Sequence, residues 1–197
     1  MIQWLIELDK KLLLYVNSMH SPTWDAITGW ASGKMSWILL YAGLLLFIIY
    51  KERPYRFIFT ILFVAITVML CDQISMLIKY LVEHPRPSYH TEFGFLSSHA
   101  TSVFGLAAFL SNQFKHFRWS LFLFAWAVLV AYSRVYLGMN YPLDVICGAV
   151  LGALTGIHCH MIKVWTVVYI ERFIADRQAV KRQAKRHEER WKKLNNI

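Results

Sequence analysis

Residues 132–148, YSRVYLGMNYPLDVICG, contain side chains that suit an anionic phosphate group. Ser133 and Arg134 come early in this stretch, and Asp144 stands towards its end, two residues after a proline. A guanidinium offers phosphate a planar fork of N–H donors, and a carboxylate near the start of a helix can orient a neighbouring group. Asn140 precedes Asp144 by four residues, the spacing of one helical turn. We therefore expect Asp144 to orient whatever residue occupies position 140.

A second candidate cluster contains two cations. Lys79 and Arg86 are separated by six residues, and prolines stand on both sides of Arg86. The prolines restrict the backbone there, which favours a fixed guanidinium able to meet phosphate oxygens. A lysine in an apolar helix is costly unless it reaches the interface or meets an anion. Lys79 alone therefore suits either a membrane anchor or an anion ligand.

The third cluster, FLSSHATS over residues 95–102, precedes an apolar run. Ser97 or Ser98 suits the N-cap of a helix, and the N–H groups at a helix start attract anions. His99 stands at the same start and can give a proton to a leaving oxygen. Taken alone, such a histidine is more often a structural residue at the membrane interface. The three clusters thus offer cations, helix-terminal donors and a proton donor.

The elements that must position these residues are membrane helices. The chain has 197 residues, of which 57% are hydrophobic and 16% aromatic, and apolar runs long enough to cross a bilayer account for this composition. We predict an all-α integral membrane protein, a bundle of about five transmembrane helices. The predicted spans are residues 35–50, 56–79, 98–114, 119–138 and 142–169.

Both ends of the chain differ from these spans. Residues 2–19 alternate apolar and charged side chains at helical spacing, which predicts an amphipathic interfacial helix, with a short tilted span as the alternative. Turn-forming residues and tryptophans follow over 21–34 and suit the headgroup region. Residues 171–197 predict a basic helix lying on anionic lipid. We therefore expect a membrane domain over 1–170, whose first 34 residues are interfacial, and a cytoplasmic tail.

The net charge of +9 follows the positive-inside pattern. Basic residues gather in the loops after the first and third spans and in the tail, and an odd number of spans places all three on the cytoplasmic face. The segments 80–97 and 136–142 then share the outer face, where the three clusters lie. This distribution makes membrane lipids the expected partner and disfavours nucleic acid.

Other residues with reactive side chains fit structural roles. The three cysteines lie in apolar segments without C-x-x-C spacing and are expected to pack. His158 and His160 flank Cys159, but side chains two residues apart on a helix point about 200° apart, so no metal site is expected. Asp72 and Gln73 in the second span either line a pocket or satisfy one another.

Together the clusters resemble the signature of the type 2 phosphatidic acid phosphatases, a superfamily of lipid phosphate phosphatases that includes the vanadium haloperoxidases. That signature is K-x6-RP, a Ser-x-His turn and SR-x5-H-x3-D. Here it reads Lys79-x6-Arg86-Pro87, Ser97-Ser98-His99 and Ser133-Arg134-x5-Asn140-x3-Asp144. The motifs cover residues 79–144, and the helix layout extends the resemblance over 35–165. The second motif departs from the usual Pro-Ser-Gly-His, a loss that removes no reacting group.

The resemblance implies a metal-independent phosphatase of membrane lipids that needs no cofactor, placed in a bacterial inner membrane with its site on the extracytoplasmic face. His99 would protonate the leaving lipid oxygen, and Asp144 would orient a histidine at position 140 that attacks phosphorus and forms a phosphohistidine. The implied phosphate ligands are Lys79, Arg86, Ser97, Ser98, Ser133 and Arg134.

Position 140 departs from this pattern because it holds asparagine. A carboxamide nitrogen is not nucleophilic, since its lone pair is delocalised into the carbonyl, but Asn140 can keep the shape and hydrogen bonding of the site. His84 and His90 lie on the same predicted face without an orienting carboxylate at helical spacing, which makes them poor substitutes. With the other site residues retained, this chain is expected to be an inactive, substrate-trapping form.

The sequence leaves the lipid open. Undecaprenyl pyrophosphate, phosphatidylglycerol phosphate, phosphatidic acid and a lipid A phosphate all join an anionic head to an apolar tail. A phospholipid-binding or transport protein that uses the same clamp without chemistry is the alternative. A haloperoxidase is disfavoured because those enzymes are soluble, whereas membrane spans surround the motifs here. Oligomeric state is not predicted.

Overall fold

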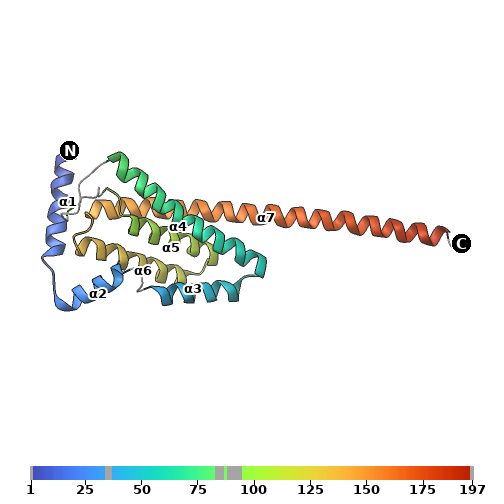
Figure 1. The fold of residues 1–197 in the computed structure, drawn as a ribbon, viewed down its shortest axis with the longest axis horizontal. Coiled ribbons are helices and arrows are strands. Elements are labelled where there is room, and N and C mark those ends of the chain that lie inside the picture. The colour runs from blue at the N-terminus through green and yellow to red at the C-terminus, as the bar shows by residue number, and fades with distance from the viewer. Residues whose placement is uncertain (1, 34–36, 83–86, 88–94, 196–197) are drawn as a thin grey trace. The chain divides into compact units, whose positions relative to one another are not determined.

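The computed structural model describes residues 2–33, 37–82, 87 and 95–195. The described residues form two compact units, Met1–His160 and Met161–Ile197, which are treated separately below. Within the described residues the secondary structure is entirely helical (Figure 1). The helices are α1 (Ile2–Asn17), α2 (Pro22–Ser32), α3 (Ile38–Lys51), α4 (Pro54–Val82), α5 (Ser98–Phe114), α6 (Phe117–Tyr136) and α7 (Pro142–Asn195).

The predicted all-α membrane bundle is confirmed, because α3 to α7 occupy the five predicted spans. Among the described residues, α4, α6 and α7 are long and apolar enough to cross a membrane, and α3 is a shorter apolar helix. The short helix α5 packs against both α4 and α6, and most of its residues from Ala100 to Leu110 are buried. Its central place explains its length, because a helix surrounded by protein does not have to match the bilayer thickness.

The N-terminal segment contains a helix over residues that were predicted to form turns. Ser21 is the N-cap of α2 and accepts a hydrogen bond from the Trp24 N–H (3.4 Å), and Pro22 is the first helical residue. A serine N-cap followed by proline at the first position is a helix start signal, so these residues begin a helix instead of a loop. In Figure 1, α1 runs across the ends of the bundle helices, and α2 leads from it towards α3.

Close backbone contact joins α5 to the first part of α7. A Cβ atom on Gly152 would lie 2.1 Å from the Thr101 carbonyl oxygen, and one on Gly156 would lie 2.1 Å from that of Gly105. Glycines four residues apart allow membrane helices to approach in this way. The contact sets the two helix starts beside each other, where the Ser97 N–H donates to the Asp144 carbonyl oxygen (3.1 Å).

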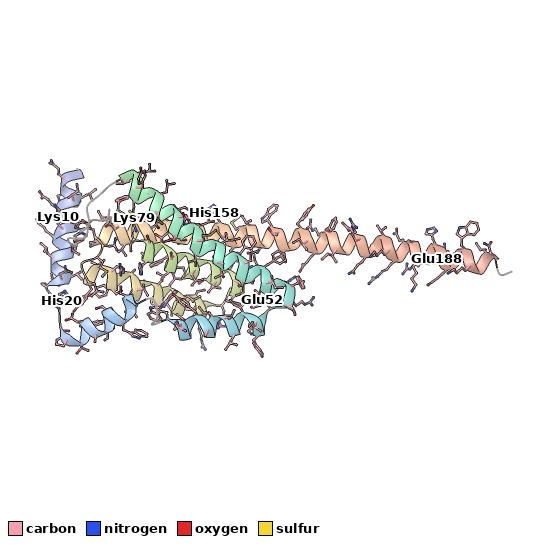
Figure 2. All side chains as sticks on the ribbon, in the orientation of Figure 1. Lys10, His20, Glu52, Lys79, His158 and Glu188 are labelled. Atoms are coloured by element: carbon pink, nitrogen blue, oxygen red, sulfur yellow. The ribbon has the colours of Figure 1, made fainter. Side chains whose placement is uncertain are left out.

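The second unit is the distal part of α7. Residues 171–192 are exposed or half-exposed, and Lys192 donates to Glu188 one turn away (2.6 Å), as expected of a polar helix surface (Glu188 is labelled in Figure 2). The predicted basic helix is therefore present, as the continuation of α7. No glycine or proline follows Gly156, so nothing in the sequence interrupts the helix at the predicted boundary near residue 170. That domain boundary stays a prediction.

Candidate active site

The described members of the three predicted clusters lie at the ends of four helices. Lys79 is in the last turn of α4, Ser98 begins α5, Arg134 is in the last turn of α6 and Asp144 is in the first turn of α7. Hydrogen bonds connect α4 to α5 and α5 to α7 at these ends. The predicted ligand Arg86 and the histidines at positions 84 and 90 lie outside the described residues.

The first connection joins a cation to the start of a helix. The Lys79 ammonium donates to the Ser98 hydroxyl (2.6 Å), which puts Nζ beside the first turn of α5 (Lys79 is labelled in Figure 2). A helix start carries partial positive charge and N–H donors that lack helical partners. A cation in the same place is unfavourable on its own, and an anion bound between the two would remove the repulsion. The pair therefore suits a phosphate group.

Ser97 is the N-cap of α5, as one of the two sequence alternatives proposed. Its hydroxyl accepts from the Ala100 N–H (3.4 Å), and only 1% of the residue is exposed. Ser98 and His99 follow it and are half-buried. Both line a cavity of about 380 Å³, which Ser32 and Asp72 line as well. The proton donor predicted from the sequence thus lines a cavity at this end of the bundle.

Position 140 is held by the turn between α6 and α7. The Arg134 carbonyl oxygen accepts from the N–H groups of Met139 (2.9 Å) and Asn140 (3.2 Å), and Gly138 adopts a positive φ of 65°. Such backbone conformations favour glycine because other residues carry a Cβ that clashes. Asn140 is 3% exposed, so its side chain is held inside the protein at the end of the bundle.

Asp144 uses one carboxylate oxygen on the backbone next to position 140. Its Oδ2 accepts from the Tyr141 N–H (3.1 Å), which is the reciprocal half of a capping box, and Asp144 is 3% exposed. Because α7 begins at Pro142, Asn140 lies ahead of the helix, and the two residues do not share a helical turn as their spacing suggested. Burial and the charges of Asp144 and Asp9 raise the pKa of Tyr141, so its phenol stays neutral.

Ser133 and Arg134 have different environments although they are adjacent. The Ser133 hydroxyl is fully buried and donates to the Val130 carbonyl oxygen of its own helix (2.7 Å). The Arg134 guanidinium is half-buried and donates through Nη1 to the Ser32 hydroxyl at the end of α2 (2.6 Å). Ser32 also lines the cavity that contains His99, which places Arg134 next to that cavity.

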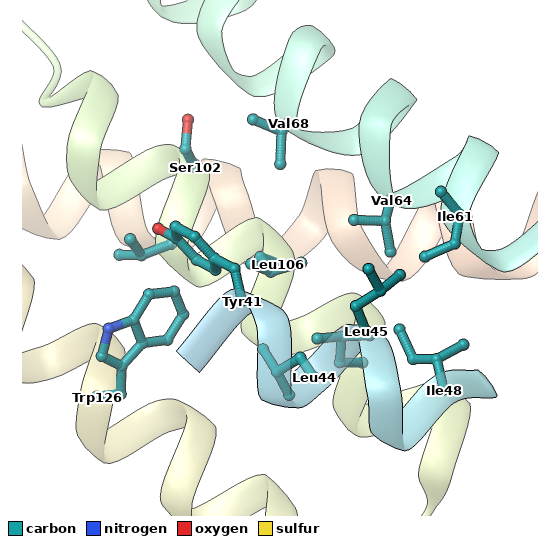
Figure 3. A pocket seen from close by; sticks show the side chains of 12 residues that line it. Tyr41, Leu44, Leu45, Ile48, Ile61, Val64, Val68, Ser102, Leu106 and Trp126 are labelled. Atoms are coloured by element: carbon teal, nitrogen blue, oxygen red, sulfur yellow. The ribbon is translucent and has the colours of Figure 1, made fainter. Parts of the chain in front are cut away.

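An apolar cavity adjoins the polar one. It measures about 440 Å³ and lies between α3, α4, α5 and α6, lined mainly by aliphatic side chains such as Leu44, Val64 and Leu106 (Figure 3). Both cavities are lined by Tyr41, Val68, Ser102 and Val103. One cavity is lined in part by Ser98, His99 and Asp72 and the adjoining one is almost wholly apolar, a combination that suits a ligand with an anionic head and a hydrocarbon tail.

Three residues at this end of the bundle were not assigned to the site by the sequence. Ser32 contacts Arg134, Asp72 lines the polar cavity, and Asp9 of α1 accepts from the Leu143 N–H at the start of α7 (3.0 Å). For Asp72 the sequence had left pocket lining and mutual satisfaction with Gln73 equally open. Local sequence carried no signal for Ser32, and Asp9 could have been suspected only as a charge on the face of α1 that also contains Leu13.

An all-α membrane bundle whose helix ends gather cations, helix-terminal donors and a histidine beside an apolar cavity defines a membrane protein of the lipid phosphatase class. The chain belongs to the PAP2 superfamily, whose family model matches residues 57–167. This assignment agrees with the resemblance seen in the sequence motifs.

Known proteins of similar sequence and structure belong to the same class. A lipid A 4'-phosphatase of Bacteroides thetaiotaomicron is 35% identical over 175 residues, which cover 79% of this chain and 77% of that protein. The crystal structure of Aquifex aeolicus LpxE is similar with a TM-score of 0.58 and 26% identity, covering 77% of this chain and 94% of that one. A transmembrane PAP2-type phosphatidylglycerolphosphate phosphatase of Bacillus subtilis shares the fold, with a TM-score of 0.66, 19% identity, and coverage of 86% and 89%.

Proposed function

We propose that this chain has the site of a metal-independent lipid phosphatase acting on a lipid phosphate, and that Asn140 stalls it before phosphoryl transfer. The observation that carries the proposal is the contact between the Lys79 ammonium and Ser98 at the start of α5 (2.6 Å), because a cation and a helix start together favour a bound phosphate. The adjoining apolar cavity would take the lipid tail. Similarity to a lipid A 4'-phosphatase makes a phosphomonoester of lipid A the first substrate to test.

The chemistry follows from the residues around position 140. A histidine there would attack phosphorus through an imidazole nitrogen, while His99 gives its proton to the leaving lipid oxygen. Water would then attack the phosphohistidine, returning a proton to His99 and releasing inorganic phosphate. Lys79 and Arg134 would stabilise the charge on the transferring phosphoryl oxygens throughout. Asn140 cannot make the nitrogen–phosphorus bond, so the chain would bind the lipid and stop there.

The charge distribution supports an extracytoplasmic placement of the site. The basic loops and tail would lie on the cytoplasmic side, which puts the ends of α4 and α6 and the starts of α5 and α7 on the extracytoplasmic side of an inner membrane. Labelling single cysteines with a membrane-impermeant reagent in intact cells tests this. A cysteine in place of exposed Tyr80 should react from outside, and one in place of exposed Lys51 should not. The opposite pattern would refute the orientation.

An assay of phosphate release from a panel of lipids distinguishes a phosphatase from a binding or transport protein. The chain and its Asn140→His variant are given lipid A phosphates, undecaprenyl pyrophosphate, phosphatidylglycerol phosphate and phosphatidic acid in detergent micelles. The proposal expects the Asn140→His variant alone to release phosphate, and addition of Lys79→Ala to abolish that release. If both versions bind a phospholipid equally and neither releases phosphate, the protein is a binding or transport protein. Asn140 itself is the observation that favours that second function.

A further inference from the structure

Helix α1 contacts both sides of the turn that contains position 140. It runs across the ends of the bundle helices (Figure 1) and reaches α6 through Asn17 and α7 through Asp9. We propose that α1 is a positioning element, in which Asp9 and Asn17 fix the turn over residues 137–141 so that residue 140 is held for the reaction. This inference rests on the proposed function for its catalytic meaning, and on contacts within the first unit for its geometry.

Asp9 is a buried carboxylate on an otherwise exposed stretch of helix. It is 8% exposed, whereas the residues on either side of it from Trp4 to Lys10 are exposed. Its Oδ1 accepts from the Leu143 N–H (3.0 Å), one of the donors at the start of α7 that has no helical acceptor. Negative charge is stabilising at a helix start because it complements the helix dipole. Asp9 therefore caps α7 from a different helix, while Asp144 bonds Tyr141 from within it.

Asn17 supplies the complementary contact at the end of α6. With its carboxamide nitrogen facing the helix, it donates to the carbonyl oxygens of Val135 and Tyr136 (3.1 Å each). These carbonyls belong to the last turn of α6, where the Val135 oxygen also accepts from the Gly138 N–H (2.9 Å). The side-chain amide also lies 3.3 Å from the place that a Cβ of Gly138 would occupy, so Asn17 fits closely against the turn.

The contacts of Asp9 with α7 and of Asn17 with α6 come from one face of α1. Asp9, Leu13 and Asn17 are four residues apart in succession and share a face of the helix. Leu13 is 6% exposed and lies in a buried cluster with residues of α6 and α7, Val135 and Val145 among them. An acceptor thus meets the start of α7 and a donor meets the end of α6, with an apolar contact between them. This arrangement sets the distance that the intervening turn must span.

Membrane anchoring alone does not account for this face. The opposite side of α1 exposes large apolar residues such as Trp4, Leu8 and Tyr15, which is sufficient for an interfacial helix. Burial of a carboxylate costs free energy unless the carboxylate makes hydrogen bonds. A helix that served only as a membrane anchor would therefore not need a buried aspartate at position 9. Helix α1 therefore has one face for lipid and another for the turn.

Hydrogen exchange tests the positioning role in the chain as it stands. In detergent micelles, Asp9→Ala should speed exchange of the Leu143 amide about fivefold, the size expected for loss of a helix cap. Asp9→Asn should largely preserve protection, because a carboxamide oxygen still accepts, and Glu7→Ala on the exposed face is the matched control. Unchanged exchange at Leu143, or exchange raised equally throughout the bundle, would overturn the inference.

Kinetics in an Asn140→His background test its catalytic meaning. There Asp9→Ala should lower kcat about tenfold with KM changed less than about twofold, since misplacing a reacting group affects the chemical step. Asp9→Asn should restore most of the rate. A kcat unaffected by Asp9→Ala would refute positioning. If Asn140→His itself releases no phosphate, the proposed function fails, and the exchange experiment still decides the role of α1.

Discussion

The backbone N–H of Ser97 donates to the carbonyl oxygen of Asp144 at 3.1 Å, which joins the start of α5 directly to the first turn of α7. Ser97 and Asp144 belong to the second and third sequence motifs, 47 residues apart (144 − 97). Their contact brings the helix start that contains His99 beside the helix that follows position 140. The spacing of His99 and position 140, the two proposed reacting positions, therefore depends on how closely α5 and α7 pack.

Enlarging the α5–α7 contact should disrupt the site. In Gly152→Ala the new Cβ would meet the Thr101 carbonyl at 2.1 Å, so the backbones must separate. We expect a loss of about 2 kcal/mol in stability and weaker binding of phosphorylated lipid. Gly43→Ala is the control, because nothing lies within 4 Å of that position. Equal unfolding temperatures for the two variants in thermal denaturation would show that the contact does not matter.

Lys79 should contribute to phosphate binding. Lys79→Ala removes the ammonium beside Ser98 and should weaken binding of a lipid phosphate about tenfold or more, without affecting the dephosphorylated lipid. Binding is measured by calorimetry or by a fluorescent lipid in micelles. Lys51→Ala, at the end of α3, is the matched loss of a lysine elsewhere. The same affinity for both lipids in Lys79→Ala would exclude Lys79 as a phosphate ligand.

Filling the junction of the two cavities should select against long lipids. Val68 lines both cavities, and Val68→Trp places a large ring where they meet (Figure 3). Binding of a long-chained lipid phosphate should weaken about tenfold, and binding of a short-chained one should change little. Leu62→Trp, half-exposed on the same helix and outside the cavity linings, is the control. Equal effects on both chain lengths would place the tail elsewhere.

The hydrogen bond between Asp25 of α2 and Tyr136 of α6 should make the protein less stable at acid pH. The Tyr136 hydroxyl donates to Asp25 (2.7 Å), and this bond, followed by the contact with His20, holds the Asp25 pKa below its usual value of 3.8. A carboxyl whose pKa is lowered by folding stabilises the protein above its unfolded pKa, and this contribution is lost as pH falls through the folded pKa.

Thermal unfolding at several pH values tests this link. The unfolding temperature should drop below about pH 4 more steeply in the parent chain than in Asp25→Asn, which has no charge to lose. Asp176→Asn, in the exposed distal part of α7, should keep the slope of the parent. Parallel curves for the parent and Asp25→Asn would show that the Tyr136–Asp25 bond adds nothing to stability.

Local patterns predicted the parts of the fold that they directly encode. Apolar runs predicted α3 to α7, and the serine pair ahead of His99 predicted an N-cap, now placed at Ser97. The pair Ser21-Pro22 is a helix start signal, and α2 begins there although the sequence pattern of turn formers predicts no helix over 21–34. The Arg134 contact with Ser32, a residue of that helix, could not be foreseen without it.

Contacts between segments that are distant in the sequence could not be predicted from the periodicity of apolar residues. Asp9 is one charge among several in an amphipathic helix, and only the folded chain brings it to the Leu143 N–H. Gly152 and Gly156 have a four-residue spacing that is visible in the sequence, but the partner helix is not. The four-residue step from Asn140 to Asp144 suggested a shared turn, whereas Pro142 starts the helix between them. Motif order located the residues, and tertiary packing determines how they meet.

The central claim is that only the nucleophile is missing from an otherwise complete phosphatase site. Incubation with a lipid A phosphomonoester labelled with ³²P, followed by a quench in alkaline detergent within milliseconds to seconds and gel analysis under alkaline conditions, tests it most directly. The account predicts that Asn140→His gains an acid-labile, alkali-stable ³²P label and releases phosphate at least about 10³-fold faster than the parent chain. A folded Asn140→His variant that acquires no label and releases no phosphate from any lipid of the panel would contradict it.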